Sequence, residues 1–169
     1  MLNRSAIGKE TKVYSFHVDK TSIKNFAESL EDYNPMYIED IDNLVQISCL
    51  KMKRPPKLSY GEDYAKKSKF GGIVMPPTFA HNFRAGKWEL MIGEAGLEIG
   101  KLLHGEEHDE YYRVVKAGET IYYKIKLTDI YDKPSPKFGT LEFMIVDVDC
   151  WDENNEPVMK YRQLFVVKP

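Results

Sequence analysis

The sequence predicts an α+β fold, in which one curved antiparallel sheet wraps around a central hydrophobic helix. Three observations support this prediction. A strand-like segment near the N-terminus leads into an amphipathic helix, an apolar helix is predicted over 78–92, and the residues from about 106 onward are rich in β-branched and aromatic types. A sheet with one apolar face must be covered, and the helix over 78–92 is the available cover.

The first strand and helix follow from periodicity. Residues 12–18 alternate between two faces and predict a strand. The next segment carries one apolar stripe at helical spacing, formed by Ile23, Phe26, Ala27 and Leu30. Its start can be capped by Asp19, Thr21 or Ser22. Pro35 predicts its end, because the residue before a proline is disfavoured in the helical region.

Glycine and proline organise the middle of the chain. Residues 41–70 contain two adjacent prolines and many lysines and arginines, and they predict a loop with one or two short helices. The stretch "GGIVMPPTF" at 71–79 follows, and its prolines suit the start of a helix. Thr78 is the expected N-cap of the apolar helix that continues to residue 92.

Four long strands are predicted in the last part of the chain. In the clearest of them, alternate positions are held by Ile121, Tyr123, Ile125 and Leu127. The predicted strands span 106–115, 119–131, 139–152 and 157–168. The turn-forming clusters "KAGE", "DKPSPKFG" and "DENNEP" separate them, so we expect antiparallel hairpins. We expect residues 1–169 to form a single domain.

Composition and charge exclude several functions. A formal net charge of −2 argues against a nucleic-acid partner held by phosphate contacts. The sequence contains no run of 18 apolar residues, so no membrane span is predicted. The N-terminus lacks the apolar region of a signal peptide, so we expect a cytoplasmic protein. Four histidines without metal-ligand spacing predict no metal site, and no cofactor is expected. We expect Cys49 and Cys150 to be free thiols.

Three motifs carry a resemblance to a known family. They are "DYNPMY" at 32–37, "FGGIVMPPTFA" at 70–80 and "LHGEEHDEYYRVVKAGETI" at 103–121. With them the chain resembles the MaoC-like dehydratases, or hydratase-2 type, of the hot-dog fold. More narrowly, it resembles the amino-terminal-type MaoC domain of the partner subunits of (3R)-hydroxyacyl-thioester dehydratases. The resemblance covers most of the chain outside about 41–62, which we interpret as an inserted or elaborated segment.

This resemblance implies reversible addition of water to a trans-2-enoyl thioester of CoA or acyl carrier protein. The family motif is an Asp, then Asn-Pro, then a His two positions after the Pro. Carried over, Asp32 and Asn34 match the motif, but Tyr37 occupies the position of the His. A phenol with a pKa near 10 is a poor base at neutral pH. The resemblance therefore implies an incomplete acid–base pair.

Other residues are candidates to complete the site. His81 or His104 is a candidate replacement base, and the alternative for each is a structural histidine. The predicted substrate-binding residues are Tyr37, Gly71, Gly72, Ile73, Thr78 and Phe79, among which amides of Ile73, Thr78 or Phe79 are expected to bind the thioester oxygen. Asp32 has the alternative of a surface acid at a helix end, and Asn34 that of a side chain capping its own backbone.

We therefore predict a component of an enoyl-thioester hydratase or (3R)-hydroxyacyl-thioester dehydratase. The alternatives are a non-catalytic subunit that binds the acyl chain and stabilises a catalytic MaoC partner, or a hot-dog thioesterase. A homodimer or a heterodimer with a second MaoC-like chain is expected, because a lone sheet leaves unpaired edge strands. The lysines and arginines of 51–69 are either a solvated face or a dock for CoA phosphates or acyl carrier protein.

Overall fold

The computed structural model describes residues 1–32, 34, 36–37, 61–82 and 86–169. The chain divides into two compact units. The first, which we call the sheet unit, comprises Met1–Phe16, Phe83–Arg113 and Ile121–Pro169. The second, the helix unit, comprises His17–Asn82 and Val114–Thr120. Most of the segment expected as an insertion, about 41–62, lies outside the described residues, as does Cys49.

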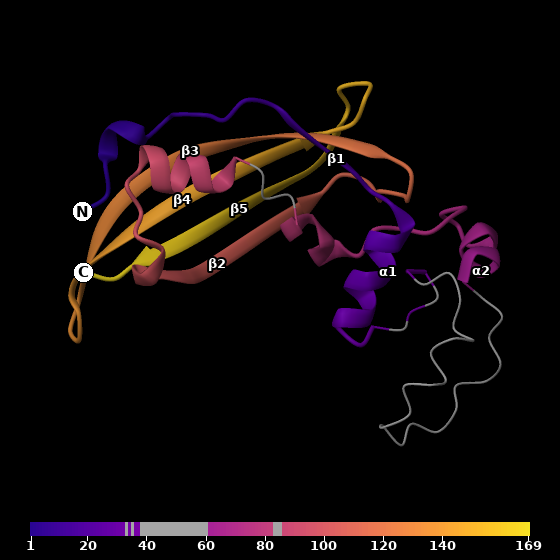
Figure 1. Ribbon diagram of the computed structural model, residues 1–169, viewed down its shortest axis with the longest axis horizontal. Coiled ribbons are helices and arrows are strands. Elements are labelled where there is room, and N and C mark those ends of the chain that lie inside the picture. Colours follow the sequence, from indigo (N-terminus) through magenta and orange to yellow (C-terminus); the bar gives the residue numbers. More distant parts are fainter. Residues whose placement is uncertain (33, 35, 38–60, 83–85) are drawn as a thin grey trace, which may run out of the picture. The chain divides into compact units, whose positions relative to one another are not determined.

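The sheet unit is built on five strands (Figure 1). They are β1 (Tyr14–His17), β2 (Leu102–Tyr111), β3 (Thr120–Ser135), β4 (Gly139–Trp151) and β5 (Pro157–Val167). Their order is β1-β3-β4-β5-β2, and β3, β4, β5 and β2 pair antiparallel in that succession. Two hairpins therefore join β3 to β4 and β4 to β5, while β2 forms one edge of the sheet.

The buried face of β3 confirms the predicted alternation. Its buried side chains include Ile121, Tyr123, Ile125 and Leu127. Burying one large apolar side chain contributes about 1.5–3 kcal/mol. A bulge between Leu127 and Asp129 then shifts the register against β4, and Ile130 is the next buried residue. Such an extra residue bends the strand locally.

Two strand boundaries differ from the prediction. β2 begins at Leu102 and ends at Tyr111, so it is displaced toward the N-terminus from the predicted 106–115. β3 continues to Ser135, with Pro134 opposite Thr140, although the prolines predicted a turn there. A proline removes one N–H donor from a strand, but its carbonyl oxygen can still accept a hydrogen bond.

The predicted continuous helix over 78–92 is wrong. The described residues there form a 3-10 helix, η3 (Pro77–Asn82), and a separate π-helical segment, η4 (Glu89–Glu94). Gly86 lies between them with φ +79°, a conformation that no right-handed helix contains. η4 lies along one face of the sheet, with Leu90 and Met91 buried (Figure 1). Within the described part of the sheet unit, this short segment lies over the sheet.

Short helical turns complete the sheet unit. η1 (Arg4–Ala6) and η5 (Ile99–Lys101) are single 3-10 turns. The N-terminal segment pairs with β3, because the Gly8 amide donates to Leu127 and the Thr11 amide donates to Ile125. No helix or strand was predicted for this segment.

The helix unit contains α1 (Lys20–Ser29) and α2 (Gly61–Lys67). Of the three candidate caps, Asp19 is the one that caps α1, since its side chain accepts the Ser22 amide at 2.8 Å. The buried residues of α1 are Ile23 and Ala27, which belong to the predicted apolar stripe. No helix among the described residues is long and apolar enough to cross a membrane.

Candidate functional site

The candidate acid–base loop begins at the C-terminus of α1. The helix ends at Ser29, and Glu31 adopts a left-handed conformation with φ +55°. The Glu31 amide donates to Glu28 and the Asp32 amide donates to Ala27, which is the hydrogen-bond pattern of a Schellman motif. The helix therefore ends well before Pro35, and not because of this proline.

Two side chains of this loop fold back onto its own backbone. Asp32 Oδ1 accepts the amide of Asn34 at 3.1 Å, and Asn34 Oδ1 accepts the amide of Met36 at 3.0 Å. Such turns are common for Asp and Asn and need no substrate to explain them. Both side chains are exposed. The structure thus shows the alternative expected for Asn34, a side chain that caps its own backbone.

A backbone hydrogen bond joins this loop to the glycine-proline segment. The Val74 amide donates to the Met36 carbonyl at 3.2 Å, so the two motifs lie side by side. On its other side, the segment pairs with residues 115–117, because Met75 donates to Val115 at 2.8 Å and Ala117 donates to Ile73 at 3.0 Å. Three stretches that are distant in the sequence are thereby brought together in one unit.

Of the glycines in this segment, Gly71 has a clear backbone role. Its φ is +71°, and its amide donates to Ser68 at 3.1 Å, so it turns the chain after α2. A Cβ built on Gly72 would meet no atom within 4 Å. The space around Gly72 is therefore open to a neighbouring group.

The start of η3 limits which backbone amides remain available to donate to a thioester oxygen. Pro76 and Pro77 have no N–H, and the Phe79 amide donates to the Pro76 carbonyl at 3.0 Å. Phe79 is also buried, and its ring is perpendicular to that of Phe26, with 5.3 Å between the ring centres. Thr78 is the second residue of η3 and not its N-cap. The candidate amide donors are therefore reduced to Ile73 and Thr78.

The Tyr37 phenol is a weaker acid than that of an ordinary tyrosine. It is half-buried. Burial raises the pKa of its phenol above the ordinary value near 10, and the negative charge of Asp32 raises it further. At neutral pH this phenol is protonated, so it can donate a hydrogen bond but cannot remove a proton from water.

The two candidate histidines lie in different units. His81 is half-buried on η3, in the same unit as Asp32. His104 is on β2 in the sheet unit, with its side chain 49% exposed and its Nε2 3.4 Å from Oε2 of Glu107. Its ring is perpendicular to that of Phe165, with 5.4 Å between the ring centres.

A buried polar chain in the sheet unit was missed by the sequence analysis. Gln163 Nε2 donates to Glu107 Oε1 at 2.7 Å, and Gln163 Oε1 accepts from the ammonium of Lys87. Lys87 and Gln163 are each only 5% exposed. The Lys87 ammonium also lies 5.5 Å from the ring centre of Tyr161. One signal was available, because Gln163 occupies an inward position in an otherwise apolar strand pattern.

A hollow of about 380 Å³ lies elsewhere in the sheet unit. Its lining includes Leu2, Lys101, Glu142 and Lys168, and none of the predicted site residues. The Leu2 amide donates to both carboxylate oxygens of Glu142, at 2.9 and 3.0 Å. The hollow is therefore no part of the candidate site.

Comparisons with known proteins bear on the fold and the family. The model of the family described as "FAS1-like, dehydratase domain region" matches residues 51–161. A UPF0336 protein from Thermobifida fusca is 23% identical over 144 residues, which cover 83% of this chain and 80% of that protein.

Two solved structures are similar across nearly the whole chain. The HadBC (3R-hydroxyacyl-ACP dehydratase) complex from Mycobacterium tuberculosis has a TM-score of 0.63 at 13% identity, covering 95% of this chain and 96% of that one. A MaoC-like dehydratase from Rhodospirillum rubrum has a TM-score of 0.59 at 15% identity, covering 96% and 92%. These likenesses confirm the expected α+β hot-dog fold.

Proposed function

We propose, because this chain belongs to the family of FAS1-like dehydratase domain regions, that it is a component of a reversible enoyl-thioester hydratase or (3R)-hydroxyacyl-thioester dehydratase. Its substrate is an acyl chain carried as a thioester on CoA or acyl carrier protein. The observation that carries the proposal is the hydrogen-bonded pairing of the Asp32–Tyr37 loop with the glycine-proline segment.

In the hydration direction, one water adds across the double bond of the enoyl thioester. Its oxygen bonds to the β carbon while a base removes one of its protons, and the α carbon receives a proton. Negative charge develops on the thioester oxygen, and in this proposal the amides of Ile73 or Thr78 donate to it. Asp32 retains acceptor capacity for the water, because a carboxylate offers more lone pairs than the one used by Asn34.

Tyr37 does not supply the general base that this reaction needs. Its phenol remains protonated at neutral pH, so it binds or orients a group but takes no proton. Loss of a positioned general base costs about 10²–10⁴ in rate. We propose that a second MaoC-like chain brings the missing histidine, and that this chain contributes the Asp32 loop and binds the acyl chain.

A second candidate function is that of a hydratase active without a partner chain. It is favoured by His81, which is half-buried, follows Thr78 closely on η3 and lies in the same unit as Asp32. In that case His81 is the base. His104, which contacts Glu107 in the other unit, is the weaker candidate for the same role.

The test measures loss of enoyl absorbance from crotonyl-CoA. We expect no turnover with this chain alone, and turnover above the partner's own level after mixing with a MaoC-like chain that has the full Asp-Asn-Pro-His motif. Turnover by this chain alone would instead assign the base to its own residues. Release of free thiol would identify a thioesterase.

A further inference from the structure

His104 and Glu107 lie on one face of β2 because the strand contains a bulge. His104 lies opposite Phe165 of β5. Glu107 lies opposite Gln163, so three steps along β2 match two steps along β5. Residues three apart on a regular strand point to opposite faces of the sheet. The bulge between His104 and Glu106 adds one residue and thereby turns both side chains to the same face.

The extra residue of this bulge is Gly105, where the space for a side chain is restricted. A Cβ built on Gly105 would fall 2.7 Å from Cδ2 of Leu164 and 3.1 Å from the Leu164 carbonyl oxygen. The leucine tip can move, but the carbonyl belongs to the backbone of a paired strand. Bulges redirect side chains and are frequent next to active sites. Gly105 therefore permits the bulge that brings His104 to Glu107.

The His104 imidazole and the Glu107 carboxylate form a dyad. Nε2 of the ring lies 3.4 Å from Oε2 of the carboxylate. A carboxylate beside one ring nitrogen keeps the proton of the neutral imidazole on that nitrogen, so Nδ1 carries the lone pair. Among the residues that the structure describes, none forms a hydrogen bond with Nδ1 of His104. Because the side chain is 49% exposed, Nδ1 can accept a proton from a water molecule.

Buried groups hold this dyad in place. Oε1 of Glu107 accepts a hydrogen bond from Nε2 of Gln163 at 2.7 Å, and Oε1 of Gln163 accepts one from the Lys87 ammonium. Gln163 and Lys87 are each only 5% exposed. On the other side of the dyad, the buried ring of Phe165 lies perpendicular to that of His104. An ordinary surface ion pair lacks such support, whereas a catalytic pair depends on it.

Space for a small substrate lies near the start of β2. The hollow of about 380 Å³ is lined by Lys101, which precedes β2, and by Val167, which is paired with Leu102. Small-molecule sites have volumes of about 300–1,000 Å³. Leu102 and His104 are two residues apart, so they share a face and are separated by about 7 Å. A short acyl group bound in the hollow can therefore approach the dyad.

We propose that His104 and Glu107 form a second acid–base site, which hydrolyses short acyl thioesters. For its substrate class this inference rests on the proposed function, in which the substrate is an acyl thioester. The site uses none of the residues of the Asp32–Tyr37 loop.

The reaction transfers the acyl group from sulfur to water. Nδ1 of His104 takes a proton from the water as the water oxygen bonds to the carbonyl carbon of the thioester. The carbon–sulfur bond then breaks, and the imidazolium gives its proton to the leaving sulfur. The products are a carboxylic acid and a free thiol. Glu107 stabilises the imidazolium through its negative charge and holds the ring in position.

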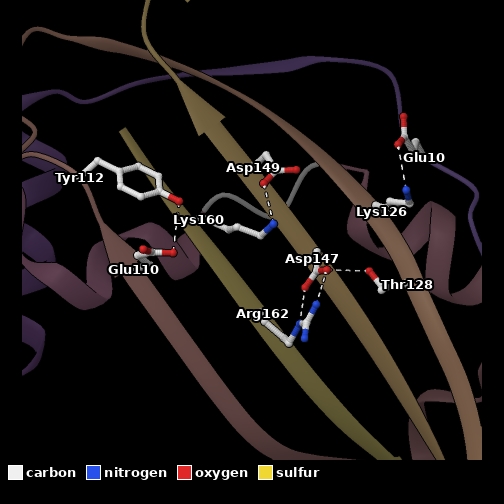
Figure 2. A network of polar contacts seen from close by, with 9 residues as sticks. All are labelled: Glu10, Glu110, Tyr112, Lys126, Thr128, Asp147, Asp149, Lys160 and Arg162. Carbon is white, nitrogen blue, oxygen red and sulfur yellow. Dashed lines mark hydrogen bonds and ion pairs between the residues drawn. The ribbon is translucent and has the colours of Figure 1, made fainter. Parts of the chain in front are cut away.

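The opposite face of β2 provides a matched control. His108 is exposed on that face, opposite Arg162 of β5. Arg162 is bound to Asp147 through two bonds of 2.6 and 2.8 Å (Figure 2). Within the described part of the chain, His108 forms no ion pair with a carboxylate. His108 is therefore a histidine of the same strand without the carboxylate partner that His104 has.

The experiment measures thiol release from butyryl-CoA by the full chain, with a thiol-reactive dye. Butyryl-CoA has no double bond, so it cannot be hydrated. We expect release above the protein-free rate, and a decrease of about 10²-fold in His104→Gln. His108→Gln should retain the wild-type rate. Glu107→Gln keeps an oxygen for the Gln163 side chain but removes the charge, so it should lower the rate at least about tenfold.

Chemical rescue distinguishes a catalytic histidine from a structural one. Imidazole added to His104→Ala should raise thiol release above the rate of imidazole alone, because the missing side chain is one that solvent reaches. The same addition should leave His108→Ala unchanged. A purely structural His104 would show no rescue, and this result would overturn the proposal.

Two further results would overturn it. One is a folded wild-type chain that releases no thiol above the protein-free rate. The other is equal rates in His104→Gln and His108→Gln. A chain that hydrates crotonyl-CoA with its partner but does not cleave butyryl-CoA would refute this inference alone. Thiol release without any hydration would instead refute the dehydratase proposal.

Discussion

The ring of Tyr14 lies directly against the backbone of Gly86. A Cβ built on this glycine would fall 2.2 Å from Cε2 of Tyr14. The ring is held in place, because it stacks on Tyr123 at 5.8 Å and its hydroxyl donates to Glu89 at 3.2 Å. Gly86 also has φ +79°. Only glycine meets both requirements at this position without strain.

Gly86→Ala should therefore destabilise the protein. The left-handed backbone costs an alanine about 1–2 kcal/mol, and overlap with Tyr14 adds about 1–3 kcal/mol. The free energy of unfolding, measured by urea titration, should fall by about 2–5 kcal/mol. Gly100→Ala is the control, since a Cβ there meets nothing within 4 Å and its φ is not positive. Equal effects of the two substitutions would contradict the role of the Tyr14 contact.

The bond between Lys87 and Gln163 predicts a second stability effect. Gln163→Leu removes an acceptor from a buried ammonium and a donor from Glu107. An unsatisfied buried polar group costs about 1–3 kcal/mol, and more when it is charged. We expect Gln163→Leu to lower the free energy of unfolding by at least about 2 kcal/mol.

A double-mutant cycle separates this bond from simple packing. Lys87→Met combined with Gln163→Leu replaces both partners with apolar side chains of similar length, so the double variant should be more stable than Gln163→Leu alone. If the two single effects simply add, the Lys87–Gln163 bond contributes no coupling and the expectation is wrong.

Asp147 predicts a pH dependence of stability. Hydrogen bonds from Arg162 lower the pKa of this carboxyl below its ordinary value near 3.8, and a bond from Thr128 lowers it further, against the opposing effect of burial. A carboxyl with a lowered pKa in the folded state stabilises the protein above its unfolded pKa, and this contribution is lost as pH falls through the folded pKa. The free energy of unfolding should therefore decrease below about pH 4.

Asp147→Asn should reduce this acid-side decrease and lower stability at pH 7. Urea titrations between about pH 2.5 and pH 7 measure both effects. Asp149→Asn serves as the control, because it changes the same group on the same strand and leaves the Arg162–Asp147 pair in place. An unchanged pH profile in Asp147→Asn would assign the acid sensitivity to other carboxyls.

The strands were predictable from sequence because their pattern is local. The alternation of apolar residues from Ile121 to Leu127 directly indicates a buried face of the strand. Clusters of turn-forming residues mark where each hairpin turns. The continuous helix was wrongly predicted because apolar residues on both sides of Gly86 suggested one element. The need for glycine there comes from Tyr14, which is far away in sequence, and no periodicity reports such a contact.

The candidate site was predictable only in outline. The hydrogen bond from Val74 to Met36 places the two motifs side by side, which no sequence pattern indicates. Other features depend on tertiary structure: the Phe79 ring is held in the core by Phe26, and Tyr37 has its pKa raised by burial. The assignment of Asp32, Asn34, His81 and His104 to catalysis remains a prediction.

Tyr37→His tests the candidate loop directly. A histidine has a pKa near 6.5, so its neutral form at pH 7.5 can remove a proton from water, which the phenol cannot do. If the Asp32 loop is the acid–base site, this variant should hydrate crotonyl-CoA without a partner, about 10²-fold faster than the wild-type chain. The partner histidine then becomes unnecessary in the assay.

Two companion variants decide what the gain means. Tyr37→Phe should remain at the wild-type level, because the phenol is not the base. Adding Asp32→Asn to Tyr37→His should remove the gain, since the water then loses its carboxylate acceptor while the loop keeps an oxygen for the Asn34 amide. A Tyr37→His variant that is folded but no more active than wild type would remove this loop from the acid–base chemistry and leave it a structural turn beside the glycine-proline segment.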